Sequence, residues 1–470
     1  MSISLSDIIE QLPEESTSDY RSLNHELFRQ LNRTCVVVDD DPTGNQTVYD
    51  IPLLTNWDIE VLIEEFKKET PTFFLLTNSR SLSEIESTQM YSQISRNILL
   101  ASQATNRAFT IISRSDSTLR GHFSEVDIIK SNIHLTNAIT VFIPVMFEGG
   151  RVTINDTHYI SNQNELTPVS ETPFAQDHTF GYKNANLKAW IEEKTKGRVK
   201  SVDIHSIGIE AIRSLDVAEL SVQINHINSD EYCIINALNY KDLDKVTNAL
   251  LLAEKMGKNI VYRTSSSFVP SYIGLKPKPV LHAEEIVDIA NKNGGLTIVG
   301  SYVPKSSIQL NRALEHFNKE TIVEVDVAKI LGEQSKMYME GLGLIIDKHI
   351  SEGKDVLVFT SRKLVTGKNS KSNINIASQV SNALVSLLKN MNSRPKYLLA
   401  KGGITSNDLA LKGLGMKRSK VIGQIEAGIP VWEMGEETKF TNLLYIVFPG
   451  NVGNENSLLN IIKKLSLYGY

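Results

Sequence analysis

The chain has 470 residues, of which 41% are hydrophobic and 22% are charged, and its formal net charge at pH 7 is −5. This composition is typical of a soluble globular protein, and the length predicts more than one domain. The acidic balance, without a run of Lys or Arg, argues against a general nucleic-acid or membrane-surface binder. There is no basic leader with an apolar core and no apolar run of membrane-spanning length, so a cytoplasmic location is expected. The two cysteines, Cys35 and Cys233, lie in or near apolar runs and are predicted to be buried thiols.

Residues 1–33 are predicted to form a helical N-terminal arm, because apolar residues recur there at roughly helical spacing. From 34 to 270, short apolar runs alternate with helical patterns, which predicts a first domain with a mostly parallel sheet covered by helices. The predicted strands are Cys35–Val38, Phe73–Thr77, Phe109–Ser113, Ala138–Pro144, Cys233–Asn236 and Ile260–Arg263. The predicted helices are 58–68, 84–104, 184–194 and 240–256.

A proline-containing stretch with little periodicity predicts a linker at 271–293, and a second domain of the same class is expected over 294–470. Its predicted strands are Leu296–Gly300, Thr321–Val325, Val356–Thr360, Tyr397–Ala400 and Leu443–Phe448. Its predicted helices are 306–317, 330–350, 376–391, 406–413 and 456–466, with a polar loop at Thr366–Asn375. The expected fold is therefore two α/β domains, each a mostly parallel sheet flanked by helices, with an active site in the cleft between them.

The strongest single feature is the run of three carboxylates that follows the first strand, Asp39, Asp40 and Asp41, before a turn that ends at Gly44. Ligands bind at the carboxyl ends of strands in open α/β sheets. Adjacent carboxylates repel one another, so a metal, a cation or a proton in transit is the expected reason for grouping them. A solvated acidic turn is the simpler alternative.

Two further loops with chemically useful side chains follow predicted strands of the first domain. One ends at Arg80, and the other runs from Ile112 to His122. If the sheet is parallel, these loops and the acidic turn open at one edge. Arginine forks suit carboxylates, and hydroxyl or carboxylate side chains suit sugar hydroxyls, so a small polyhydroxylated acid is the predicted ligand. The residues predicted to bind it are Asp40, Arg80, Arg114, Ser115, Asp116, Ser117, Thr118 and Arg120. Taken singly, Arg80 or Arg120 is better explained by a surface salt bridge.

The segment Pro144–Tyr159 contains Gly149, Gly150 and Arg151 after a strand. It could close over the same site, and a plain hairpin turn explains it equally well. The polar loops that begin at Glu171 and Arg263 are unusual, but periodicity assigns them no role.

The second half has no P-loop, no G-x-G-x-x-G after a strand and no protein-kinase signature set. Three of its strand-to-helix junctions are nevertheless rich in glycine. One joins Gly300 and Ser301 to a helix expected to be capped by Ser306 and Gln309. The others are Gly402–Asp408, with the helix expected to start at Thr405 or Ser406, and Pro449–Asn454. Glycines let a backbone approach a ligand, and helix N-termini favour anions, so the three turns predict a cradle for nucleotide phosphates.

Together these motifs resemble the four-carbon acid sugar kinase family, which phosphorylates threonate, erythronate or 3-oxo-tetronate-type acids with ATP. The resemblance runs from about Cys35 to near the C-terminus. It rests on six motifs in order: Asp40-Asp-Pro-Thr-Gly44, Ser79-Arg80, Asp116-Ser-Thr-Leu-Arg-Gly121, Gly300-Ser301, Gly402-Gly-Ile-Thr405 and Pro449-Gly-Asn-Val-Gly453. It implies an N-terminal sugar-acid domain and a C-terminal nucleotide domain.

The resemblance also implies roles for individual residues. Asp40, Arg80 and the loop Arg114–Thr118 match the substrate contacts of the family. The matches to its ATP contacts are Ser301, Gly402, Gly403, Ile404, Thr405, Gly450 and Asn451. Many members have Lys where this chain has Arg114, which leaves the identity of the acid open.

The expected reaction moves the γ-phosphoryl group of ATP to a hydroxyl of the acid, with Mg²⁺ bridging phosphate oxygens. Arg80 and Arg114 would hold the substrate carboxylate, and Asp40, Asp41 or Asp116 would accept the hydroxyl proton. The sequence identifies no metal ligands. It does not fix the oligomeric state, and a homodimer is compatible with it.

Two alternatives stay open. Asp39 and Asp41, with Thr43, also fit the motif of haloacid-dehalogenase phosphatases, in which Asp39 would be the nucleophile. No later strand ends in the paired acids that such enzymes need for Mg²⁺, and the three glycine turns would have no use. The other alternative is a non-catalytic sensor of the same ligands.

Overall fold

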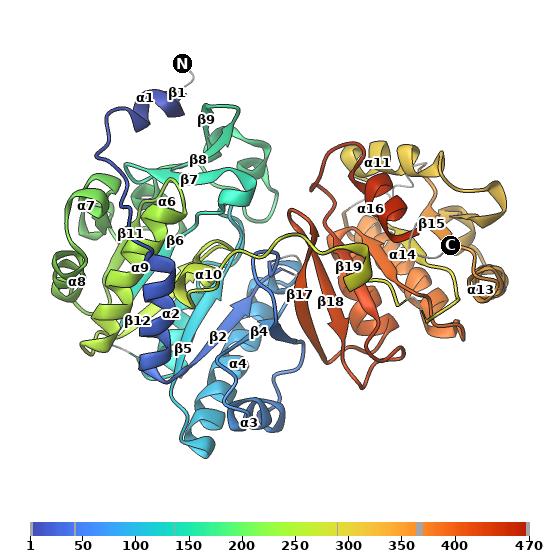
Figure 1. Ribbon diagram of the computed structural model, residues 1–470, viewed down its shortest axis with the longest axis horizontal. Helices are drawn as coiled ribbons and strands as arrows, with labels where there is room; N and C mark the ends of the chain where they lie inside the picture. The colour runs from blue at the N-terminus through green and yellow to red at the C-terminus, as the bar shows by residue number, and fades with distance from the viewer. Residues whose placement is uncertain (1–2, 42–43, 136, 289, 363–369, 467–470) are drawn as a thin grey trace. The chain divides into compact units, whose positions relative to one another are not determined.

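A computed structural model of the chain describes residues 3–41, 44–135, 137–288, 290–362 and 370–466. The chain divides into two compact units. The first comprises residues up to Val48 together with Asn56–Pro277, and the second comprises Tyr49–Thr55 together with the chain from Lys278 onward. Figure 1 shows both units as α/β structures. Within the predicted linker, 271–293, the chain passes from one unit to the other at Pro277, and Leu281, Ile286 and Val287 beyond it are already buried.

The first unit is built on a parallel sheet. Its strands, in spatial order, are β10 (His205–Ile207), β11 (Tyr232–Ile235), β6 (Ile139–Ile143), β12 (Ile260–Thr264), β5 (Phe109–Arg114), β2 (Thr34–Asp39) and β4 (Thr72–Leu76). All of β2 and β4 is buried, which explains why they read as continuous apolar runs instead of alternating patterns. The predicted parallel sheet is confirmed, and each predicted strand of this half is present within a residue or two of its expected bounds.

Helices cover this sheet. They are α2 (Tyr20–Leu31), α3 (Ile59–Lys67), α4 (Glu84–Thr105), α5 (Glu125–Asn132), α6 (Leu187–Lys194), α7 (Ile209–Ser214), α8 (Val217–His226), α9 (Tyr240–Lys255) and α10 (Phe268–Tyr272). In the N-terminal arm, α2 lies beside α9 (Figure 1). The buried Asn24 fixes it there by donating to the backbone oxygens of Asp244 and Ser271 at 3.0 and 3.1 Å.

A small antiparallel sheet, which the sequence did not predict, completes the first unit. Its strands, in spatial order, are β1 (Ile3–Ser4), β9 (Glu165–Pro168), β8 (Thr157–Asn162) and β7 (Arg151–Ile154), and the short helix α1 (Leu5–Ile9) follows β1. Val152, Ile154 and Leu166 of this sheet form a buried cluster with Ile209 and Leu238. The buried His158 ties the sheet to the loop after β5, because its Nε2 lies 2.8 Å from the backbone oxygen of Ser117.

The second unit has a mixed sheet. Its strands, in spatial order, are β3 (Ile51–Leu54), β17 (Arg418–Glu426), β18 (Ile429–Met434), β19 (Leu444–Phe448), β16 (Leu398–Lys401), β13 (Leu296–Val299), β15 (Val356–Thr360) and β14 (Ile322–Val325). The strands from β19 to β14 are parallel, as predicted. β17 and β18 form an antiparallel hairpin that the sequence analysis missed, and β3 joins it from far away in the chain.

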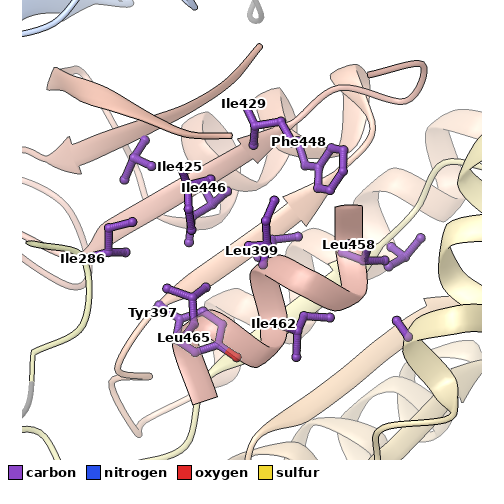
Figure 2. Packing of buried hydrophobic residues seen from close by; sticks show 14 of the residues in the cluster. Ile286, Tyr397, Leu399, Ile425, Ile429, Ile446, Phe448, Leu458, Ile462 and Leu465 are labelled. Carbon is purple, nitrogen blue, oxygen red and sulfur yellow. The ribbon is translucent and has the colours of Figure 1, made fainter. Parts of the chain in front are cut away.

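The helices of the second unit are α11 (Pro304–Leu314), α12 (Val327–Ile330), α13 (Ser335–Ser351), α14 (Ser370–Asn390), α15 (Gly403–Asp408) and α16 (Ser457–Ser466). Figure 2 shows how α16 places Leu458, Ile462 and Leu465 against strand residues such as Leu399 and Ile446. Of the predicted loop Thr366–Asn375, residues 366–369 lie outside the described residues, and α14 already begins at Ser370.

Neither cysteine forms a disulfide, since Cys35 and Cys233 are both buried and free, as predicted. Within the described ranges, no helix is both long and apolar enough to cross a membrane.

Candidate functional site

The register of the first sheet brings the chemically useful loops to one edge. Asp39 at the end of β2 faces Leu76 at the end of β4 and Arg114 at the end of β5. Arg114 in turn faces Thr264 at the end of β12. The loops that leave these strands therefore start side by side, as expected for parallel strands.

Arg114 is buried among carboxylates of its own chain. Its Nη1 lies 3.1 Å from Asp39 Oδ1 and 3.6 Å from Asp40 Oδ1, and its Nη2 donates to Ser266 Oγ at 2.7 Å. A buried guanidinium needs such partners, because an unpaired charge in the interior is costly. Arg114 is thus positioned at the site, and both of its terminal nitrogens are engaged within the protein, while its Nε has no hydrogen-bond partner among the described residues.

Asp39 is wholly buried at this position. Burial raises the pKa of its carboxyl to about 7, although the guanidinium of Arg114 opposes the shift, and the neighbouring Asp40 raises it further. Its Oδ1 also accepts a hydrogen bond from the backbone N–H of Asp41 at 3.1 Å. Asp39 therefore fixes the geometry of the acidic turn.

Arg80 connects the two acidic segments. It follows β4 in a single helical turn, and its Nε lies 3.4 Å from Asp40 Oδ2 while its Nη1 lies 3.4 Å from Asp116 Oδ1. Its Nη2 also contacts the Asp41 carboxylate. The surface salt bridge considered for Arg80 alone is not what the structure has, because one arginine here links three carboxylates.

Asp116 is held ionised by two arginines. Burial alone would raise the pKa of its carboxyl, but the charges of Arg80 and Arg120 hold that pKa well below its usual value. Arg120 Nε donates to Asp116 Oδ2 at 2.8 Å, and Thr118 Oγ1 bonds to the same oxygen. A carboxylate with so low a proton affinity is suited to positioning and is a weak base.

Asp40 is reached by a chain of hydrogen bonds that begins in the protein interior. Arg263 Nη2 donates to Ser115 Oγ at 3.0 Å, and Ser115 Oγ donates to Asp40 Oδ2 at 3.0 Å. Arg263 is itself paired with the buried Glu125, whose Oε1 lies 3.3 Å from Arg263 Nε. The other oxygen, Asp40 Oδ1, is buried and has no hydrogen-bond partner among the described residues.

Gly121 makes room for this arrangement. Its φ of 114° lies in the left-handed region, where only glycine is unstrained. A Cβ at this position would come within 3.1 Å of Asp40 Oδ2 and 3.3 Å of Ser115 Oγ. The glycine that ends the loop is therefore required by the closeness of the carboxylate.

The structure brings together most of the residues predicted for the acid. Seven of them take part in the network just described: Asp40, Arg80, Arg114, Ser115, Asp116, Thr118 and Arg120. Asp41 joins through Arg80, whereas Ser117 donates to Met146 Sδ at 3.4 Å. Pro42 and Thr43 of the same motif lie outside the described residues. The sequence assigned no role to Arg263 or Ser266. The polar run at the end of β12, in which both lie, could have indicated that they belong to the site.

In the second unit, the three glycine turns meet at the aligned ends of β13, β16 and β19. Val299 faces Lys401, and Lys401 faces Phe448. Gly402 adopts a φ of 119°, and a Cβ there would lie 2.9 Å from the Cβ of Ser301. The turns are packed so closely that there is no room for a side chain at position 402.

Hydroxyl and amide side chains fasten the turns to one another. Ser306 Oγ donates to Gly450 O at 3.0 Å and lies 2.9 Å from Ser301 Oγ. Gln309 Nε2 donates to the backbone oxygens of Val452 and Asn454 at 3.1 and 2.6 Å. The predicted capping role of Ser306 and Gln309 is wrong, because α11 already begins at Pro304 and both side chains serve the neighbouring turn instead.

The remaining predicted nucleotide contacts surround the same turns. α15 begins at Gly403, earlier than the expected start at Thr405 or Ser406, because Gly402 already occupies the position before the helix. Thr405 packs against Gly300, whereas the side chain of Ile404 is 68% exposed. The backbone oxygen of Asn451 accepts a hydrogen bond from Lys305 Nζ at 3.2 Å.

Two cations here were missed by sequence reasoning. The wholly buried Lys401 donates from Nζ to Pro449 O at 3.2 Å, and its Nζ lies 3.5 Å from the centre of the Phe448 ring. Burial, with the charge of Lys305, lowers the pKa of Lys401 to about 7. Arg362 Nη1 donates to Ser301 O at 2.6 Å. Lys401 and Arg362 both lie just after predicted strands, and this position at a strand end could have identified them from the sequence.

No group of three or more His, Cys, Asp or Glu in the described part of the chain is arranged to hold a metal ion. The acidic turn of the first unit illustrates why. Its carboxylates are already paired with Arg80 and Arg114, which supply the positive charge there.

Comparison with known proteins agrees with the predicted division into a sugar-binding first half and a nucleotide-binding second half. Residues 35–272 match a family model described as a sugar-binding N-terminal domain, and residues 296–458 match one described as a nucleotide-binding C-terminal domain. A comparison with the curated proteins found no match.

Two solved structures resemble the whole chain in fold. The Haemophilus influenzae protein HI1011, of the family DUF1537, is 15% identical with a TM-score of 0.61, over 92% of this chain and 100% of that one. A Salmonella typhimurium LT2 protein provisionally named a tRNA synthase is 14% identical with a TM-score of 0.65, over 92% of this chain and 98% of that one. At such identities the likeness concerns the fold alone. Together with the two domain matches, it shows that the chain belongs to the family that joins a sugar-binding N-terminal domain to a nucleotide-binding C-terminal domain, which is the architecture of the four-carbon acid sugar kinases.

Proposed function

We propose that the protein is an ATP-dependent kinase that phosphorylates a hydroxyl of a four-carbon acid sugar, such as threonate, erythronate or a 3-oxo-tetronate. The observation that supports this most is the network of Asp40, Arg80 and Asp116 at the strand ends of the sugar-binding domain. The glycine turns of the nucleotide-binding domain supply the second half of the proposal, since such turns suit the phosphates of ATP.

In the proposed reaction, a hydroxyl oxygen of the acid attacks the γ-phosphorus of ATP. The bond from that phosphorus to the bridging oxygen breaks, ADP leaves, and the hydroxyl proton passes to a carboxylate. We assign this proton to Asp40, because Asp40 Oδ1 has no hydrogen-bond partner among the described residues. Asp116 is a weaker candidate because of its lowered pKa, and Asp41 is already in contact with Arg80.

Asp40 is buried, with 1% of its surface exposed. Its role as the base therefore requires the Arg80 side chain, which lies 3.4 Å away, to move aside when the acid binds. Asp116 would hold Arg80 in its second position, because the same guanidinium already pairs with both carboxylates. Turns near Ser301, Gly402 and Gly450 would contact the triphosphate through backbone N–H groups.

Mg²⁺ is the usual companion of ATP in such transfers, and it neutralises charge on the phosphates. The described residues offer it no cluster of ligands, so phosphate oxygens and water would have to supply most of its coordination. No step in the proposed mechanism depends on a protein ligand to the metal.

The phosphatase alternative is disfavoured by the position of Asp39. A nucleophilic carboxylate must reach a phosphorus atom, but Asp39 is wholly buried and pairs at 3.1 Å with Arg114, which is itself buried. The Arg80 beside Asp40, in contrast, is partly exposed. Burial raises its pKa to about 7, which further reduces its nucleophilic form near neutral pH.

A screen of ATP consumption over four-carbon sugar acids and their 3-oxo forms tests the proposal. A kinase should release ADP only when an acceptor is present, and mass spectrometry should find one added phosphoryl group on the acid. Release of inorganic phosphate from phosphoesters without ATP would support the phosphatase instead. Saturable binding of ATP and acid with no product over hours would support the sensor.

A further inference from the structure

The arginines expected to hold the acid's carboxylate are already engaged. Arg80 pairs with Asp40, Asp41 and Asp116, and Arg114 pairs with Asp39 and Asp40. A further carboxylate brought to either guanidinium would also face the carboxylates already there, and like charges repel. A sugar acid therefore needs a different cation for its carboxylate.

Arg151, at the start of β7, has no such engagement. Among the described residues, no carboxylate lies within salt-bridge distance of it, and its one hydrogen bond from the side chain runs from Nη1 to Gly149 O at 2.5 Å. Its Nε is buried without a hydrogen-bond partner among the described residues, as are the Nε atoms of Arg80 and Arg114, so the lack of a neighbouring carboxylate is what distinguishes Arg151. Burial lowers the pKa of Arg151, but a guanidinium stays protonated in proteins. It is a partly buried positive charge, and among the described residues its Nε and Nη2 have no hydrogen-bond partner.

Local structure holds Arg151 beside the acidic network. The backbone N–H of Arg151 donates to Met146 O at 2.9 Å, and Met146 Sδ accepts from Ser117 Oγ at 3.4 Å. Phe174 is near two arginines, with Arg151 Cζ 6.0 Å and Arg120 Cζ 5.0 Å from its ring centre. Arg120 in turn binds Asp116, and the charges of Asp116 and Arg120 both act on the pKa of Arg151, which places Arg151 next to the network.

We propose that Arg151 binds the carboxylate of the acceptor and so determines the preference for sugar acids over neutral polyols. The proposal rests on the proposed function for its substrate class. A free guanidinium edge can donate two parallel hydrogen bonds to a carboxylate, which a polyol cannot accept in the same way. The Phe174 face limits how far the guanidinium can turn, and a pre-oriented fork loses less freedom on binding.

Equilibrium binding of threonate and of threitol to the full chain tests the proposal without catalysis. Arg151→Met should weaken threonate binding about 10-fold to 100-fold, the range of a hydrogen-bonded charge pair, and should leave threitol binding nearly unchanged. Arg151→Lys keeps the charge but loses the paired donors of the guanidinium. Its affinity for threonate should lie between those of the wild type and Arg151→Met. Equal threonate affinity in the wild type and a folded Arg151→Met protein would overturn the proposal, as would a wild type that binds no sugar acid.

Arg107→Met is the matched control. Arg107 precedes β5, at the opposite end of that strand from Arg114, and donates to Thr34 Oγ1 and Asn32 Oδ1 at 3.2 and 2.8 Å. The Arg107→Met protein should bind threonate and threitol with the affinities of the wild type. The midpoint of thermal unfolding of each variant should show that the variant is folded. The outcome is separable from that of the kinase proposal. Threonate binding that depends on Arg151, in a protein that consumes no ATP, would support this inference and contradict the kinase.

Discussion

The two units build their candidate sites from different materials. The first uses charged side chains that neutralise one another, such as Arg80 and Arg114 with the carboxylates of the acidic turn. The second uses backbone turns, with Gly402 packed against Ser301, and small side chains that fasten them. The first site should therefore be sensitive to a change in charge, whereas the second should be sensitive to added bulk near its backbone.

The largest expected effect tests the charge balance of the first unit. Arg114→Met should leave the buried Asp39 without its ion-pair partner and Asp40 with Arg80 alone, so the free energy of unfolding should fall by about 3–5 kcal/mol, the usual cost of breaking a buried pair. Urea denaturation measures it. Arg198→Met removes an exposed partner of Asp127 and should change the free energy by less than about 1 kcal/mol. Equal effects of the two substitutions would show that burial of the first pair is unimportant.

The next effect separates the carboxylates by role. Asp40→Asn should lower turnover by about 10²-fold or more, the scale of a positioned base, whereas Asp116→Asn should act mainly on the KM for the acid. Steady-state kinetics with ATP and the best acid distinguish the two. Asp203→Asn, on an exposed turn, is the control and should behave like the wild type. Near wild-type turnover in Asp40→Asn would remove Asp40 as the base.

Added bulk should affect the second site selectively. Gly402→Ala places a Cβ 2.9 Å from Ser301 at a φ of 119°, a strain that should weaken nucleotide binding about tenfold and leave acid binding unchanged. Gly341→Ala is the matched control, because Gly341 lies in α13 with nothing within 4 Å of the added atom. Calorimetric titration with ATP and with the acid measures both affinities. Equal losses for the two ligands would contradict the assignment of nucleotide binding to these turns.

Opposite dependences on pH should sharpen the contrast. Burial raises the pKa of Asp39 from 3.8 to about 7, so its unit binds extra protons when folded and loses stability as the pH rises through that window. Burial, with Lys305, lowers the pKa of Lys401 from 10.5 to about 7, so its unit gains stability as the pH rises from about 7 to 10.5.

The check uses urea denaturation of two variants against the wild type. Asp39→Asn should become more stable relative to the wild type as the pH rises toward 7, and Lys401→Met should become less stable relative to it above pH 7. Differences that do not change with pH would mean that neither group has the shifted pKa.

The sequence predicted the parallel sheets because buried strands such as Cys35–Val38 carry a strong local signal. It missed the β17–β18 hairpin and the pairing of β3 with β17, since those pairs depend on contacts between segments far apart in the chain. The small sheet that carries Arg151 was missed for a different reason, because its strands alternate weakly between polar and apolar residues.

The sequence predicted which residues of the candidate site lie close together, but it did not predict which of them form ion pairs with one another. Strand ends predicted that Asp40, Arg80 and Asp116 would meet, and they do. Pairing within the site could not be read from the sequence, because the partner of Arg114 depends on strand register and on burial. That pairing changes the expected role of Arg114 from binding a substrate carboxylate to balancing Asp39.

The fate of the γ-phosphoryl group tests the central claim most directly. With ATP labelled at the γ-phosphorus and a four-carbon sugar acid as acceptor, the label should appear in a phosphate monoester of the acid, in equal amount to the ADP formed. Label found only in inorganic phosphate, or retained in ATP with every acid tested, would contradict the account.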